Sequence, residues 1–303
     1  MCRVVAYLGR PIQLAHILYA TDSSLVTQTY RPQMLANLNL AGFGMALWNT
    51  GSSQPDEPLV YRTTKLPAFD PNLRNLSWKL EATCLVAHVR GVTLGRADDV
   101  SEQNVHPFHF GDAGVAVAHN GHLREFARMR YDLVEHIRPE VACSIGGTTD
   151  SEWLSALVIS QLDGPAPEAD DLVEAIVKAL RILREVRRRH GIATSSPVNL
   201  FLGTGQCLVA TRFSFDYGWY PEDDPLLEID LPYASLWYTA GEGYAERDGT
   251  WEMVGDGPAR SFLIASEPLT KNTSTWLEMP EYAVLSASLR DGRVETECHD
   301  VDV

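Results

Sequence analysis

The chain of 303 residues is 45% hydrophobic and 21% charged, which is ordinary for a globular protein large enough to bury a sizeable core. Its formal net charge of −15 argues against a nucleic-acid partner, because the phosphate backbone is bound by basic surfaces. No apolar run reaches about 18 residues, so no membrane span is expected, and the N-terminus lacks the apolar stretch and cleavage region of a signal peptide.

The five cysteines indicate neither a disulfide framework nor a thiolate zinc site, because their number is odd and none belongs to a C-x-x-C pair. This usage fits a reducing cytoplasm. Cys84 and Cys207 lie in apolar, strand-like runs, which predicts buried and unreactive thiols. Cys2 differs, because removal of Met1 leaves its thiol beside a free α-amine. An α-amine titrates near pH 8, so part of it is the neutral base that a nucleophile needs.

The first part of the chain predicts strands that end in polar segments. Residues 3–8 form an apolar run that ends at Gly9-Arg10-Pro11, and residues 12–19 then show helical spacing. Further strands are expected at residues 45–48, 59–62, 83–89 and 114–118. The strand at 83–89 leads to Arg90, and the strand at 114–118 leads to His119-Asn120-Gly121-His122.

Helices dominate the middle of the chain, and strands return after it. Helices are expected at residues 123–137, 150–162 and 170–190, where the last carries a continuous apolar stripe. Thr149 and Glu152 have the spacing of a capping box. The basic cluster at 184–189 is expected to face solvent. Strands are expected at residues 198–202, 207–213, 236–239, 261–265 and 282–289.

The order of strands, helices and strands predicts an α+β fold with sheets packed between helix layers. No break in composition and no internal repeat divides the chain, so residues 1–303 are expected to form a single domain.

Three polar positions at element ends are candidates for a substrate site. The guanidinium of Arg90 suits bidentate binding of a carboxylate, although this segment alone favours a surface ion pair. The Asn120 amide and the Gly121 N–H are suitable donors to an oxyanion, although Asn-Gly is also a common hairpin turn. Asp150, at a glycine-rich helix start, either complements the helix dipole or binds an ammonium group. Arg90 and Asp150 together would clamp the head of an α-amino acid.

Five ordered segments resemble the class II glutamine amidotransferases, a family of N-terminal-nucleophile hydrolases. They are Met1-Cys2-Arg3, His88-Val89-Arg90-x-x-Thr93, His119-Asn120-Gly121, Thr149-Asp150-Ser151-Glu152 and Ala265-Ser266-Glu267-Pro268-Leu269. Two more segments, Asn39-x-x-Gly42-Phe43-Gly44 and Asn104-x-His106-Pro107-Phe108, resemble its stand-alone branch. That branch includes the γ-glutamyl hydrolase of ergothioneine biosynthesis and the amidase subunit of glutathione degradation. One departure is Ala41, where the family usually has Asp.

The resemblance implies a four-layer αββα sandwich of two mainly antiparallel sheets and no cofactor or metal. It implies a γ-glutamyl amidohydrolase that acts on a small molecule through a thioester. The implied catalytic residues are Cys2, Asn120 and Gly121; the implied substrate-binding residues are Arg90, Thr93 and Asp150; and Ser266 and Glu267 would support the N-terminus. A homo-oligomer, or a synthase or peptidase partner subunit, stays open. The amine side of the substrate is expected to contact variable loops around residues 27–32 and 217–220.

Three other readings compete with this one. The first is a glutaminase subunit that passes ammonia to a separate synthase. The second is a metal hydrolase, suggested by the H-x-x-H pairs His106/His109 and His119/His122. Pro107 and the Asn-Gly pair make both segments poor helix interiors, which disfavours that reading. The third, a binding module with an inactive site, is disfavoured because every expected catalytic position is filled.

Overall fold

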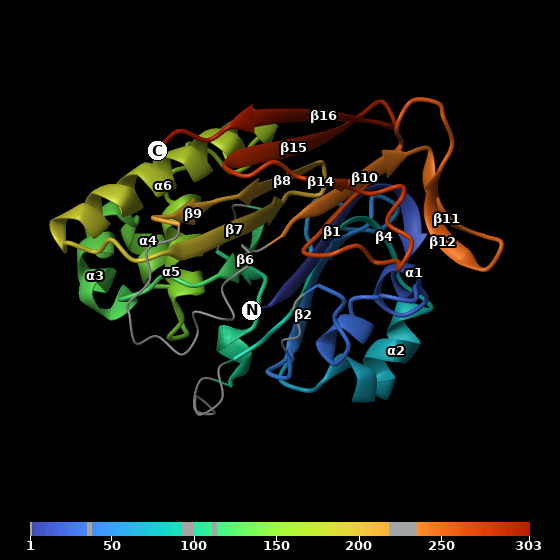
Figure 1. Ribbon diagram of the computed structural model, residues 1–303, viewed down its shortest axis with the longest axis horizontal. Helices are drawn as coiled ribbons and strands as arrows, with labels where there is room; N and C mark the ends of the chain where they lie inside the picture. Colours follow the sequence, from blue (N-terminus) through green and yellow to red (C-terminus); the bar gives the residue numbers. More distant parts are fainter. Residues whose placement is uncertain (1, 35–37, 93–99, 111–113, 218–234) are drawn as a thin grey trace.

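Two antiparallel sheets lie face to face at the centre of the protein (Figure 1). The computed structural model describes residues 2–34, 38–92, 100–110, 114–217 and 235–303. The first sheet has the strand order β14 (Leu277–Glu278), β10 (Trp237–Gly241), β13 (Ser261–Ala265), β1 (Arg3–Gln13), β4 (Glu81–Val89), β2 (Phe43–Trp48) and β3 (Leu59–Thr63). The second has the order β16 (Arg293–Asp300), β15 (Ala283–Arg290), β8 (Cys207–Arg212), β7 (Ser196–Gly203), β6 (Ala116–Gly121) and β5 (Phe108–His109), with β9 (Ser214–Phe215) also paired to β7.

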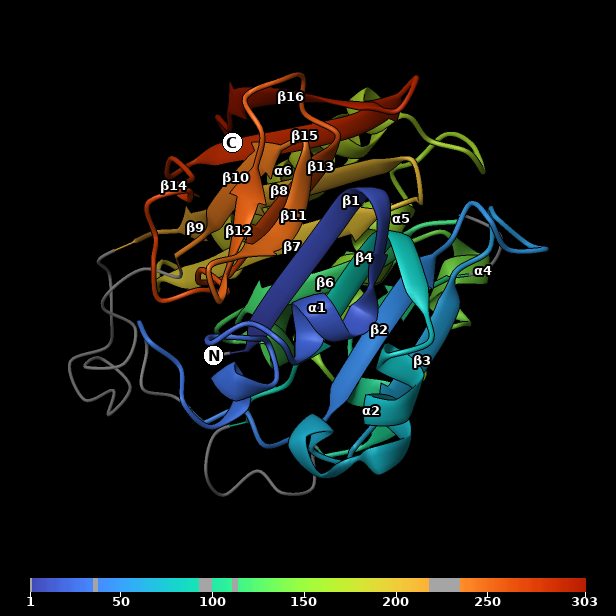
Figure 2. The same cartoon turned by 90° about the vertical axis from the view of Figure 1, so that its right-hand side faces the viewer.

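Helices cover the outer faces of both sheets. The first sheet carries α1 (Leu14–Leu18) and α2 (Pro71–Ser77), which Figure 2 shows in front of β1, β4 and β2. The second carries α3 (Phe126–Leu133), α4 (Pro139–Ala142), α5 (Asp150–Ile159) and α6 (Ala169–Arg189). A separate hairpin consists of β11 (Gly243–Arg247) and β12 (Thr250–Val254). None of the described helices is both long and apolar enough to cross a bilayer.

Alternation along the strands separates the core into layers. In β1, Val4, Ala6 and Leu8 point between the two sheets and share a cluster with Phe201 of β7. Val5 and Tyr7 point the other way, toward α1, as the two-residue period of a strand requires. A third cluster joins the outer face of the second sheet to α5 and α6. These layers confirm the expected α+β, αββα sandwich.

The first strand is longer than its sequence suggests. After an irregularity between Leu8 and Ile12, the chain pairs again, so that Ile12 and Gln13 lie opposite Ala82 and Glu81. The strand therefore continues through the predicted stop at Gly9-Arg10-Pro11, and α1 begins at Leu14 instead of residue 12. Gly9 has a φ of +146°, and a side chain there would clash with the Arg260 carbonyl.

The Asn-Gly pair lies inside a strand instead of following one. Asn120 and Gly121 are the last residues of β6 and pair with Asn199 and Val198 of β7. The hairpin-turn reading of this segment is therefore wrong, because pairing with a distant strand holds it extended.

The helix predictions hold in outline but miss two side-chain contacts. Thr149 accepts a hydrogen bond from Glu152 N at 3.3 Å, but the Glu152 carboxylate binds the N–H groups of Gly146 and Gly147 at 2.9 and 2.6 Å. The reciprocal half of a capping box is therefore replaced by a loop contact. In α6 the basic cluster is not wholly exposed, because Arg187 is 1% exposed and pairs with Asp216 at 2.8 Å.

Candidate active site

Cys2 lies half-buried at the start of β1, beside the end of β4. Its sulfur accepts a hydrogen bond from Gly91 N, with a donor–acceptor distance of 3.4 Å. Its carbonyl accepts one from Arg3 Nη1 at 3.0 Å. The thiol is thus partly exposed to solvent and lies next to a backbone donor. Hydrogen bonds to the sulfur and to the carbonyl hold the residue in place. Met1 lies outside the described residues.

The segment after β13 holds the residues that follow Cys2. Val4 N donates to Ser266 Oγ at 3.0 Å, and Ser266 N donates to Val4 O at 2.9 Å. Arg3 Nε lies 3.6 Å from Glu267 Oε2, and both side chains are almost fully buried. Burial lowers the pKa of Arg3, while the Glu267 charge opposes that shift.

The buried Glu267 carboxylate also binds a distant loop. It accepts hydrogen bonds from Gln33 N at 3.1 Å and Met34 N at 2.9 Å. A buried ion pair is tolerated when further hydrogen bonds satisfy it, as they do here. Glu267 therefore connects the residue after Cys2 to the loop at residues 33–34. The sequence indicated support of the N-terminus by this segment but gave no sign of the loop contact.

Asn120 and Gly121 belong to the second sheet and lie beside the Ser266 segment. Asn120 is 2% exposed, and its Nδ2 donates to Ser266 Oγ at 3.1 Å. One hydroxyl therefore contacts both the Cys2 strand and the Asn120 amide. His122 N donates to Pro197 O at 3.0 Å, and N–H directions alternate along a strand, so the Gly121 N–H faces away from β7. A side chain at position 121 would clash with the Pro197 carbonyl, which explains the glycine.

Arg90 continues directly from β4, as the sequence predicts. It is 6% exposed, which rules out the alternative of a surface residue. Its N–H donates to Gly42 O at 2.9 Å, and its carbonyl accepts from Ala41 N at 2.9 Å. Ala41, the departure from the family pattern, therefore contacts the Arg90 backbone directly.

Three buried histidines lie next to Arg90 and Asn120. The rings of His88 and His106 stack at 4.1 Å between centroids, and His119 N donates to His106 Nδ1 at 3.4 Å. His119 Nδ1 lies 2.9 Å from Ser151 Oγ of α5. Burial lowers the pKa of all three, and that of His88 and His106 falls well below 6.5. These side chains are therefore neutral at physiological pH.

Asp150 begins α5 and faces the residues that follow β6. Its Oδ1 accepts from Ser151 N at 2.8 Å, and its Oδ2 accepts from Leu123 N at 2.6 Å. His122 Nδ1 lies 3.2 Å from the same Oδ2. Burial alone would raise the pKa of Asp150, but His122, His119 and the Leu123 N–H outweigh it and hold the pKa at about 2. Asp150 is therefore ionised near neutral pH and 13% exposed.

The structure thus places Cys2, Asn120, Ser266 and Glu267 around the start of β1, through contacts with Gly91, Arg3 and Val4. Arg90 directly precedes Gly91, and Asp150 contacts Leu123, two residues after Gly121. Thr93 lies outside the described residues, as do positions 218–220 of the expected acceptor region. Gly91 and His122 were not expected to take part. The signal for both was their position directly after Arg90 and Gly121.

The metal-site reading gains no support from the described residues. They contain no group of three or more His, Cys, Asp or Glu side chains suited to hold a metal ion. His119 lies in β6, where residues three apart point to opposite faces, so His119 and His122 do not share a helix face.

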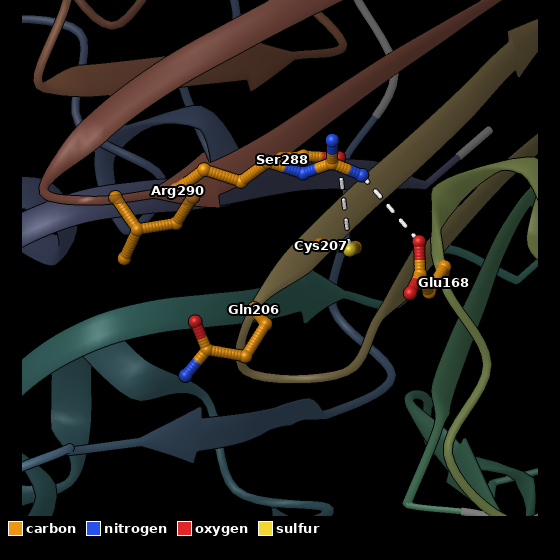
Figure 3. Close-up of a pocket in the computed structure, with 6 residues that line it drawn as sticks. Glu168, Gln206, Cys207, Ser288 and Arg290 are labelled. Atoms are coloured by element: carbon orange, nitrogen blue, oxygen red, sulfur yellow. Dashed lines mark hydrogen bonds and ion pairs between the residues drawn. The ribbon is translucent and has the colours of Figure 1, made fainter.

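A shallow pocket lies at the other end of the β7–β8 hairpin (Figure 3). Cys207 is one of its lining residues and lies 3.8 Å from Ser288 Oγ, and Glu168 and Arg290, which also line it, pair at 3.4 Å. Burial raises the pKa of Cys207. Both charged side chains are mostly exposed and pair with each other, whereas the Arg3–Glu267 pair beside Cys2 is almost fully buried.

Comparisons with known proteins agree with this geometry. Residues 19–301 match the family model described as class-II glutamine amidotransferases. A probable glutamine amidotransferase of Saccharomyces cerevisiae is 26% identical over 94% of this chain and 81% of its own length. The gamma-glutamyl-hercynylcysteine sulfoxide hydrolase of Mycolicibacterium smegmatis is 26% identical over 53% of this chain and 63% of its own. The solved structure of a glutamine aminotransferase class-II domain protein from Silicibacter pomeroyi shares the fold, with a TM-score of 0.61 and 20% identity over 100% of both chains.

Proposed function

Because the chain belongs to the class II glutamine amidotransferases, a family of enzymes, we propose that it hydrolyses the γ-glutamyl amide bond of a small molecule through Cys2. The family match begins at residue 19, so the role of Cys2 rests on its own contacts. The observation that carries the proposal is the Ser266 hydroxyl, which contacts Val4 of the Cys2 strand at 3.0 Å and Asn120 at 3.1 Å. This hydroxyl connects the strand that follows Cys2, the proposed nucleophile, to Asn120, the proposed oxyanion donor.

The first half of the reaction forms a thioester. The α-amine of the processed Cys2 takes the thiol proton, and the sulfur attacks the γ-carbonyl carbon. Asn120 Nδ2 and the Gly121 N–H donate to the oxygen as it becomes negative. The carbon–nitrogen bond then breaks, and the amine leaves with the proton that the α-ammonium returns.

The second half hydrolyses that thioester. Water gives its proton to the Cys2 amine and attacks the same carbonyl carbon, so that glutamate leaves and the thiol is restored. Arg90 binds the substrate α-carboxylate, and Asp150 binds the α-ammonium; Thr93, which the family resemblance assigns to substrate binding, lies outside the described residues. Ser266 and Glu267 position the N-terminal strand. Arg90 and Asp150 suit the glutamyl end of the substrate, because a guanidinium and a carboxylate bind the two charges of an α-amino acid.

The proposal is tested by a substrate screen with purified protein. Glutamate release from L-glutamine, glutathione and a set of γ-glutamylamides should identify at least one substrate, and Cys2→Ala should release none. Asp150→Asn should raise KM for these substrates much more than it lowers kcat. Glutaminase activity that appears only with an added synthase would favour the ammonia-supplying subunit instead.

A further inference from the structure

We propose that His122 is a specificity-determining residue, which occupies the ammonium position on Asp150 in the free enzyme and, when protonated, competes with the substrate for it. The inference rests on the proposed function, because it assumes that Asp150 binds the α-ammonium group. It adds a residue that neither the sequence motifs nor the reaction steps require.

Asp150 contacts two fixed backbone donors and one movable side-chain donor. The N–H groups of Ser151 and Leu123 belong to the backbone and hold the carboxylate in place, at 2.8 and 2.6 Å. The third donor, His122 Nδ1 at 3.2 Å, belongs to a side chain that is 52% exposed. Rotation of that side chain toward solvent removes one donor from Asp150 Oδ2, which keeps its hydrogen bond from Leu123 N. The carboxylate itself is only 13% exposed, so its exposed surface is much smaller than that of His122.

Charge decides whether His122 and an ammonium group can share the carboxylate. A carboxylate has lone pairs for several donors, so a neutral imidazole and an ammonium group can both be accommodated. A protonated imidazole and an ammonium group repel each other at that distance, and one negative charge cannot fully compensate both. Protonated His122 therefore weakens binding of an α-amino substrate, whereas neutral His122 does not.

Asp150 and His119 are described titratable groups that lie near His122. Asp150 lies on α5, 3.2 Å from His122 Nδ1, and His119 lies on β6 and interacts electrostatically with both of them. Burial keeps the pKa of His119 low, so it adds no second positive charge near neutral pH. The adjoining part of β7 supplies the Pro197 carbonyl, which carries no charge. Arg124 follows on the same segment, and its N–H donates to Ser196 Oγ at 3.1 Å. Because the charge of an imidazole group changes between about pH 5 and 8, binding is compared at the two ends of that range.

Equilibrium binding to the Cys2→Ala protein tests this without interference from turnover. In that background, calorimetry measures the Kd of L-glutamine at about pH 5.5 and pH 8 for His122, His122→Gln and His122→Lys. At pH 5.5 the parent and His122→Lys proteins should bind about two- to fivefold more weakly than His122→Gln, the range of partly exposed ion pairs. At pH 8 the parent should match His122→Gln, while His122→Lys stays weaker.

His299 gives a matched control, because it is also 52% exposed and lies 3.4 Å from the Glu297 carboxylate. His299→Gln should leave Kd unchanged at both pH values. Glutaramate, which lacks the α-amine, should bind the His122 variants without the pH-dependent gap. Circular dichroism confirms that each variant is folded.

The outcomes distinguish this inference from the proposed function. If Asp150→Asn weakens L-glutamine binding but all His122 variants bind alike at both pH values, His122 does not compete and the inference is overturned. A gap that persists with glutaramate would also overturn it. If Asp150→Asn binds L-glutamine as tightly as the parent, the ammonium-binding role of Asp150 fails, and the proposed clamp fails with it.

Discussion

Two thiols at different ends of the sandwich show what distinguishes a candidate nucleophile from a buried cysteine. Cys2 lies where β1 meets the ends of β4, β13 and β6, and a backbone N–H donates to its sulfur at 3.4 Å. Cys207 begins β8 at the far end of β7, in the pocket of Figure 3, where burial raises the pKa of its thiol. Both belong to the same pair of sheets, yet their surroundings differ.

The difference lies in the polar groups that each strand end gathers. Around Cys2, Arg3 and Glu267 are paired and buried, and Ser266 and Asn120 are hydrogen-bonded to each other. Around Cys207 the charged groups are exposed and paired across the pocket mouth. A pocket that contains a thiol is therefore not sufficient for catalysis at a carbonyl, which needs hydrogen-bond donors that are fixed before the substrate arrives.

The largest expected effect separates the two thiols directly. Cys2→Ala should reduce turnover by at least about 10⁴-fold, because it removes the proposed nucleophile and leaves only substrate binding. The melting temperature should stay near that of the parent, since the Cys2 side chain is half-exposed. Steady-state glutamate release and a thermal scan measure both quantities. Substantial turnover in this variant would contradict the assignment.

The next effect tests the donors beside Cys2. Asn120→Ala should lower kcat by about 10²- to 10³-fold, the usual loss for one oxyanion donor, with a smaller change in KM. Ser266→Ala is the companion variant: it keeps the Asn120 amide but removes its 3.1 Å contact, so its loss should be smaller. Equal losses in kcat and in binding for Asn120→Ala would instead indicate a purely structural role.

A smaller effect concerns the pH dependence of stability, which the buried histidines near Cys2 should determine. Burial lowers the pKa of His88 and His106 well below 6.5. The unfolded chain therefore binds protons first as pH falls below about 6.5, and the free energy of unfolding declines there. Each such histidine contributes up to about 1.4 kcal/mol per pH unit. Urea unfolding at pH 7.5 and 5.5 measures the decline, which should be shallower in His88→Phe; an unchanged slope would contradict it.

The smallest expected effect lies at the other thiol. Cys207→Ala should change kcat/KM less than twofold and cost about 1 kcal/mol of stability, because it removes a small buried group and a weak contact with Ser288. Loss of glutamate release on this substitution would mean that the two ends of the sandwich are coupled.

Local sequence patterns predicted those parts of the fold whose causes are local. The apolar stripe of α6 and the strand leading to Arg90 are such cases, and so is the Thr149 cap, which accepts from Glu152 N at 3.3 Å. The short helix α2 was missed, although Asp70 before Pro71 is a helix-start signal.

Long-range pairing decided the rest. Asn120-Gly121 has the composition of a turn, but pairing with Asn199 and Val198 makes it a strand. Arg187 belongs to a basic run, but its pairing with Asp216 buries it. For the site, the sequence indicated the residue types. The contacts of Ser266 with Val4 and Asn120 join positions far apart in the chain, and only the fold specifies these contacts.

Intact-mass and peptide mass spectrometry of acid-quenched, actively turning-over enzyme tests the central claim most directly. The account predicts active protein that has lost the mass of Met1, together with a fraction that carries one γ-glutamyl group on the peptide beginning at Cys2. Active protein that retains Met1, or a γ-glutamyl group attached to any other residue, would contradict it.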